Sequence, residues 1–162
     1  MSLSDELIAA NARYVEHGFP GARPLRPRRA LAIVACMDSR MDLFALLGLE
    51  VGDAHVLRNG GGVITDDVIR SLAISQRKLG TKGIVLVHHT DCGMTKLRDD
   101  EFASELEAAT GERPGFAIEA FQDADASVRE SIARLQRSPF VVSDDVAGFV
   151  FDVETGRIRP VA

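Results

Sequence analysis

The sequence predicts an α/β domain built on a mainly parallel central β-sheet. Short apolar runs typical of buried strands alternate along the chain with segments whose apolar residues recur at helical spacing. One run, residues 83–88, is apolar without interruption, as expected of a parallel strand covered on both faces. We expect helices to flank the sheet, and all 162 residues to form a single domain.

The first 28 residues are expected to form a helix followed by an extended arm. Ser4, Asp5 and Glu6 favour a helix start, because serine caps free amide groups and acids suit the first turn. The helix should end at Gly18, and the three prolines within residues 19–27 predict an extended segment. This arm is too apolar for a free tail, so we expect it to pack on a partner subunit.

The rest of the chain alternates between predicted strands and helices. Strands are predicted at residues 29–35, 54–57, 83–88 and 140–142, with a closing hairpin or edge strand within 149–158. Helices are predicted at residues 42–49, 65–79, 102–109 and 124–137. Gly80 and Pro139 follow two of these helices, as residues that end helices commonly do.

Composition excludes several classes of protein. Hydrophobic residues make up 46% and charged residues 27%, as in ordinary globular domains, and the net charge of −5 gives no reason to expect nucleic acid as a partner. No stretch is apolar enough to span a membrane, and we find no secretory signal, so we expect a cytoplasmic protein. Two cysteines are too few for a disulfide framework, although one bridge is possible.

Soft metal ligands follow two of the predicted strands. Cys36 comes at the end of the first strand, and His89 and Cys92 come just after the third. Ligands of open α/β sheets bind at such ends, and zinc favours thiolate and imidazole. Three protein ligands would leave a fourth position for water. Taken singly, each residue is more often a packing or hydrogen-bonding residue; together they predict one zinc site. His88 should alternate to the opposite face and pack there.

Two further motifs lie near these ligands. Asp38 and Arg40 follow Cys36, and a carboxylate paired with arginine stays ionised in a fixed orientation. Such an aspartate could orient metal-bound hydroxide, or bind the metal as a fourth ligand; a plain ion pair in a turn is the alternative. Gly60, Gly61 and Gly62 precede a predicted helix, as in anion-binding turns, although glycine content fits a flexible turn equally well.

These motifs together resemble the β-class carbonic anhydrases, and most closely their short actinobacterial-type subgroup. The resemblance covers nearly the whole chain and rests on three motifs, which are Cys36-Met37-Asp38-Ser39-Arg40, Arg58-Asn59-Gly60-Gly61-Gly62 and His89-Thr90-Asp91-Cys92-Gly93.

The resemblance implies both a reaction and an assembly. It implies reversible hydration of carbon dioxide to bicarbonate by zinc-bound hydroxide, with one Zn²⁺ per subunit on Cys36, His89 and Cys92 and with Asp38 and Arg40 as the catalytic pair. It also implies an antiparallel edge strand and a homodimer embraced by N-terminal helices, or a tetramer. The chain has no Trp and one Tyr, so the non-catalytic bicarbonate site of some relatives is not evident.

Some assignments stay open at the level of sequence. No proton shuttle is evident, and His55 is the one weak candidate. A zinc hydrolase of carbon disulfide or carbonyl sulfide would carry the same zinc site. A non-catalytic anion-binding or sensor module would need neither Asp38 nor Arg40. A nucleotide-binding domain would leave Cys36, His89 and Cys92 unexplained.

Overall fold

The computed structural model describes residues 2–161 and contains one five-stranded sheet in the order β2-β1-β3-β4-β5. The central strand β1 pairs in parallel with β2 and β3, β3 pairs in parallel with β4, and β5 joins β4 antiparallel. The predicted parallel sheet with an antiparallel edge strand is therefore confirmed. The strands are β1 (Leu31–Cys36), β2 (Ala54–Asn59), β3 (Gly83–His89), β4 (Val146–Phe151) and β5 (Ile158–Pro160).

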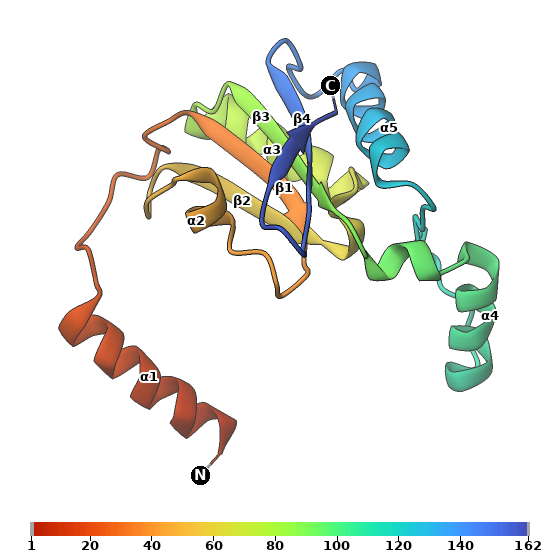
Figure 1. Ribbon diagram of the computed structural model, residues 1–162, viewed down its shortest axis with the longest axis horizontal. Helices are drawn as coiled ribbons and strands as arrows, with labels where there is room; N and C mark the ends of the chain where they lie inside the picture. Colours follow the sequence, from red (N-terminus) through yellow and green to blue (C-terminus); the bar gives the residue numbers. More distant parts are fainter. Residues whose placement is uncertain (1, 162) are drawn as a thin grey trace.

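Helices cover the sheet on both faces (Figure 1). On one face, α3 (Asp66–Leu79) and α5 (Ala124–Arg137) pack their buried side chains against alternate residues of β1 and β3. On the other, α2 (Leu43–Leu47) and the loops after β1 and β3 enclose a second apolar cluster. Every residue of β1 after Leu31 is buried, which explains the uninterrupted apolar sequence of this strand.

The helix ends mostly follow the predicted signals. Thr65 caps α3, and Gly80 ends it in the left-handed conformation, as expected. Helix α1 (Leu3–His17) begins earlier than predicted, because Ser2 and not Ser4 is its cap and forms a reciprocal pair of hydrogen bonds with Asp5. Both α1 and α4 (Asp99–Thr110) extend away from the sheet (Figure 1).

The predicted strand at residues 140–142 is wrong. The backbone of Val142 is hydrogen-bonded by a side chain and not by a neighbouring strand. Its N–H donates to Gln76 Oε1 at 2.9 Å, and its carbonyl accepts from Gln76 Nε2 at 2.7 Å. The fourth strand is instead β4, which starts three residues before the predicted hairpin. The hairpin itself is confirmed, since β4 and β5 pair antiparallel.

Candidate metal centre

Three metal-binding side chains meet at the carboxyl ends of neighbouring strands. Cys36 ends β1, His89 ends β3, and Cys92 follows His89 after a two-residue turn. Because β1 and β3 are adjacent and parallel, both ends open at the same edge of the sheet. The donor atoms of the three buried residues lie within 4.8 Å of one another. The structure thus brings together the three ligands that the sequence predicted.

His89 is oriented for metal binding by its neighbour. Its Nδ1–H donates to the Thr90 carbonyl at 2.8 Å, so Nε2 carries the free lone pair. This Nε2 is buried and has no hydrogen-bond partner among residues 2–161, which is costly unless something binds it. The sulfur atoms of Cys36 and Cys92 are 3.9 Å apart, and both thiols are free. Two thiols and one unpartnered imidazole nitrogen fit zinc.

The surroundings favour a negative charge at Cys36. The pKa of its thiol is lowered, because the Cys92 thiol donates to it and because His89 and the amide groups of Asp38 and Gly61 outweigh the opposing effect of burial. Burial by itself would lower the pKa of His89, but the negative sulfur of Cys36 raises it. A bound dication would lower the pKa of both thiols.

Asp38 lies beside these ligands and is held by Arg40. Arg40 donates from Nε to Oδ1 at 2.9 Å and from Nη2 to Oδ2 at 2.8 Å, and its backbone N–H also reaches Oδ1 at 2.9 Å. These hydrogen bonds hold the pKa of Asp38 well below its usual range, so the carboxylate is ionised. Its Oδ2 is 3.7 Å from His89 Nε2. The predicted pair therefore exists and adjoins the three ligands.

Arg58 braces the loop that carries this pair, a role that the sequence did not reveal. Its guanidinium donates to the carbonyls of Cys36, Met41 and Asp38 at 2.9, 3.1 and 2.6 Å. One side chain thereby satisfies three backbone groups of residues 36–41. The motif drew attention to Arg58, but only the fold shows which carbonyls its side chain reaches.

The glycine turn packs against the end of β1. It is a tight turn, η1 (Gly60–Gly62), in which Gly61 and Gly62 are buried and have left-handed φ of 84° and 71°. The Gly61 amide helps to lower the pKa of the Cys36 thiol, because it favours the negatively charged sulfur. The predicted contact of this turn with substrate stays a prediction.

His88 and His55, the two other histidines considered from the sequence, lie outside the metal centre. His88 is buried, donates from Nε2 to the Gly62 carbonyl at 3.1 Å and stacks on Phe121, and burial lowers its pKa to about 4. His55 pairs in register with Ala32, four positions before Cys36, or about 13 Å away at 3.3 Å per residue. This distance removes His55 as a direct proton shuttle.

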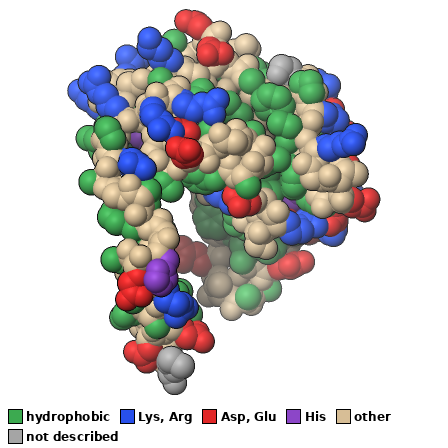
Figure 2. Space-filling model, turned by 60° about the vertical axis from the view of Figure 1, so that its left-hand side comes forward, with side chains coloured by type: hydrophobic (Ala, Val, Ile, Leu, Met, Phe, Trp, Pro, Cys, Tyr) green, Lys and Arg blue, Asp and Glu red, His purple; other side chains and the backbone are tan. Residues whose placement is uncertain are grey.

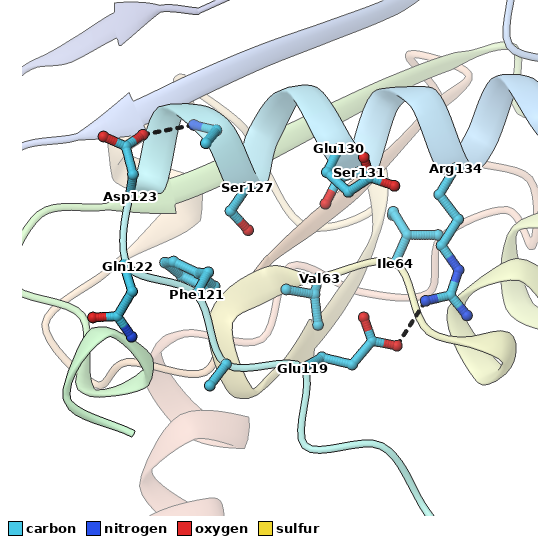
Figure 3. A pocket seen from close by; sticks show the side chains of 12 residues that line it. Val63, Ile64, Glu119, Phe121, Gln122, Asp123, Ser127, Glu130, Ser131 and Arg134 are labelled. Atoms are coloured by element: carbon cyan, nitrogen blue, oxygen red, sulfur yellow. Dashed lines mark hydrogen bonds and ion pairs between the residues drawn. The ribbon is translucent and has the colours of Figure 1, made fainter. Parts of the chain in front are cut away.

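Two pockets flank the glycine turn. One, of about 360 Å³, has mostly apolar walls that include Met37, Gly60 and Met94, and Met94 also packs in the cluster that contains Cys36 and Cys92. The other, of about 410 Å³, lies along α5, where Glu119 is bonded to Arg134 (Figure 3). Neither pocket is lined by the three ligands or by Asp38 and Arg40. The first lies nearer the metal centre, because its walls include Met37, which follows Cys36, and Met94, which packs with Cys36 and Cys92.

The fold and the site together define an α/β metalloprotein with a Cys-His-Cys centre beside an Asp–Arg pair. Residues 31–158 match the family model described as carbonic anhydrase. Beta-carbonic anhydrase 1 of Mycobacterium tuberculosis is 49% identical over 162 residues, which cover 99% of each chain. The crystal structure of carbonic anhydrase from Streptococcus mutans is similar with a TM-score of 0.93 and 46% identity, covering 100% of this chain and 99% of that one. The chain belongs to the β-class carbonic anhydrases.

A second group of relatives has a different name. A carbon disulfide hydrolase of Acidithiobacillus thiooxidans is 36% identical over 159 residues, which cover 81% of this chain and 72% of that protein. Its lower identity and coverage make it a more distant relative than the mycobacterial protein.

Proposed function

We propose that this protein catalyses the reversible hydration of carbon dioxide to bicarbonate, with one zinc ion per subunit held by Cys36, His89 and Cys92. The observation that carries the proposal is the buried, unpartnered Nε2 of His89 beside two free thiols and an ionised Asp38. The similarity to beta-carbonic anhydrase 1 over nearly the whole chain supports it. When bound, zinc would supply a Lewis acid that lowers the pKa of its water and so makes that water a nucleophile.

Asp38 and Arg40 are the proposed catalytic pair. Arg40 binds both oxygens of Asp38 and keeps the carboxylate ionised and in one orientation. A carboxylate in this state accepts hydrogen bonds, so Asp38 can orient the reacting water from its place beside His89. If Arg40 released it, Asp38 could turn to the metal as a fourth ligand and close the site.

Carbon dioxide would approach through the apolar pocket beside the glycine turn. Met37 and Met94 give this pocket walls that suit an apolar gas, and Gly60 leaves the backbone of the turn open to it. We propose that the backbone of Gly60, Gly61 and Gly62 contacts the substrate or the bicarbonate product. The Gly61 amide, which helps to lower the pKa of the Cys36 thiol, supports a polarity that suits an anion.

Stopped-flow measurement of carbon dioxide hydration on protein of known zinc content tests this function. We expect zinc-dependent turnover that rises toward alkaline pH, because two thiolates offset the charge of the ion and leave its water less acidic. Cys36→Ser should lose zinc and activity together, whereas Asp38→Asn should keep zinc and lose turnover. Full zinc occupancy without hydration at any pH would refute the proposal.

Carbon disulfide or carbonyl sulfide hydrolysis is the second candidate. It is favoured by the similarity to carbon disulfide hydrolases, at 36% identity for the Acidithiobacillus thiooxidans protein. The same centre could serve either reaction, so the two are separated by direct competition between the substrates. Turnover of carbon disulfide that exceeds hydration of carbon dioxide would favour this candidate. A zinc protein inactive on both would be a non-catalytic module.

We infer that the protein is a homodimer, or a tetramer of the same chain. Within residues 2–161, α1 buries none of its side chains, although several of them are apolar. At least 60% of the surface is exposed for each of Leu3, Leu7, Ile8 and Val15. Hydrophobic side chains lie along the projecting helix (Figure 2). A lone helix of this length is marginal in water. A partner subunit that receives α1 and the arm to residue 28 would bury this surface.

The proposed location is the cytoplasm. Two free thiols only 3.9 Å apart suit a reducing compartment, where thiols persist. In the part of the chain that the structure describes, no helix combines the length and the apolar character that crossing a bilayer requires.

A further inference from the structure

Asp91 contacts Arg40 of the catalytic pair, on the side opposite to Asp38. Its Oδ2 accepts from Arg40 Nη1 at 3.0 Å, and its backbone carbonyl accepts from Arg40 Nη2 at 3.0 Å. Arg40 therefore lies between two carboxylates, Asp38 on one side and Asp91 on the other. The proposed roles of the metal centre make no use of Asp91.

The backbone around Asp91 is fixed so that both acceptors face Arg40. Thr90 continues the sheet, because its N–H donates to the Phe151 carbonyl at 2.8 Å and its hydroxyl accepts from the Val153 N–H at 3.1 Å. Asp91 then takes a left-handed conformation, with φ of 49°, which is uncommon for residues other than glycine. The chain thus turns sharply at a residue whose carbonyl and carboxylate bind the same guanidinium.

Asp38 and Asp91 do not compete for the same edge of Arg40. Asp38 takes the edge formed by Nε and Nη2, whereas the Asp91 carboxylate takes Nη1. The Arg40 side chain is 44% exposed, so without Asp91 one side of its guanidinium would face water. A long, exposed side chain held at one edge samples more orientations than one held at two.

We propose that Asp91 is a positioning residue that holds Arg40 in the orientation in which it keeps Asp38 beside the metal centre and off the metal. This inference rests on the proposed function of Asp38 and Arg40 and adds the group that fixes them. Asp38 Oδ2 is 3.7 Å from His89 Nε2, and it is bonded to Arg40 Nη2, so the orientation of Arg40 bears on how this oxygen lies beside the metal centre.

Three variants separate positioning from a general effect of charge. Asp91→Gly removes the carboxylate, and glycine adopts the left-handed backbone without strain. Asp91→Asn keeps an oxygen that can accept from Nη1, and asparagine also tolerates this conformation. Lys96→Met is the matched control, because Lys96 Nζ forms the other ion pair of Asp91, at 3.1 Å from Oδ1, without touching Arg40.

Two readouts are measured on zinc-loaded protein. One is the exchange with water of the Arg40 Nε–H, followed by ¹⁵N–¹H NMR and assigned by its loss in Arg40→Lys. The other is the separation of kcat from KM for carbon dioxide. For Asp91→Gly we expect kcat to fall and Nε–H exchange to quicken about two- to fivefold, as for the loss of one exposed ion pair, with KM nearly unchanged. Asp91→Asn should recover most of the loss, and Lys96→Met should match the wild type.

Several results would overturn the inference. Asp91→Gly with unchanged exchange and kcat would show that Arg40 needs no second anchor. An equal loss in Lys96→Met would point to surface charge, and loss of zinc from Asp91→Gly would show that Asp91 supports the ligands instead. If the zinc-replete wild type fails to hydrate carbon dioxide, the proposed function falls, and Nε–H exchange still decides the role of Asp91.

Discussion

Adding one methyl group at Gly62 should damage both the fold and the metal centre. A Cβ there would lie 2.7 Å from the backbone nitrogen of Cys36 and 2.8 Å from the carbonyl carbon of Ala35. These atoms cannot give way easily, because β1 is paired on one side with β2 and on the other with β3.

The cost can be worked out from the structure. The φ of 71° at Gly62 costs an alanine about 1–2 kcal/mol, and forcing a methyl group against a packed backbone costs about another 1–3 kcal/mol. We therefore expect Gly62→Ala to lower the free energy of unfolding by about 2–5 kcal/mol. Cys36 should shift as well, so zinc affinity should fall.

Gly60→Ala is the matched control in the same turn. A Cβ at Gly60 would meet only the sulfur of Met94 at 3.5 Å, an ordinary contact, so this variant should stay within about 1 kcal/mol of the wild type. The assay is urea unfolding at one fixed protein concentration, with the zinc content of each variant measured beforehand. Gly62→Ala with full zinc and a stability equal to that of Gly60→Ala would refute the reasoning.

Three other perturbations have defined outcomes. In Arg58→Lys the lysine cannot reach all three carbonyls of the loop, so we expect the free energy of unfolding in urea to fall by about 1–3 kcal/mol and zinc to be released faster to a chelator. The exposed Arg70→Lys should change both quantities little. Arg28 lowers the pKa of Asp53, so this carboxylate stabilises the fold above about pH 3.9, its unfolded pKa, and loses that effect as the pH falls through its lower folded value. Urea unfolding of zinc-free protein should therefore show Asp53→Asn less stable than wild type at pH 7, with the difference shrinking toward pH 3; a constant difference would contradict this. Deleting residues 1–18 removes α1 and should yield monomers in analytical ultracentrifugation, and a deleted chain that still dimerises would place the interface elsewhere.

Much of the fold followed from local patterns in the sequence. The apolar run of residues 83–88 predicted a buried parallel strand, and Thr65 and Gly80 marked the limits of α3, because burial and capping depend on neighbouring residues. The wrong strand prediction at residues 140–142 arose from a contact that is distant in the sequence. The backbone there is satisfied by Gln76, 66 residues earlier, and no local pattern reports such a partner.

The sequence by itself determined which residue types stand at the strand ends, and thus the identity of Cys36, His89 and Cys92 as candidate ligands. Only the tertiary structure decided how they are supported. Arg58 reaches three carbonyls at least 17 residues away, and Arg40 bridges two carboxylates that are 53 residues apart, 91 minus 38. The reason is physical: periodicity and capping act over a few residues, whereas hydrogen bonds between distant segments exist only after the parallel strands have brought their ends to one edge.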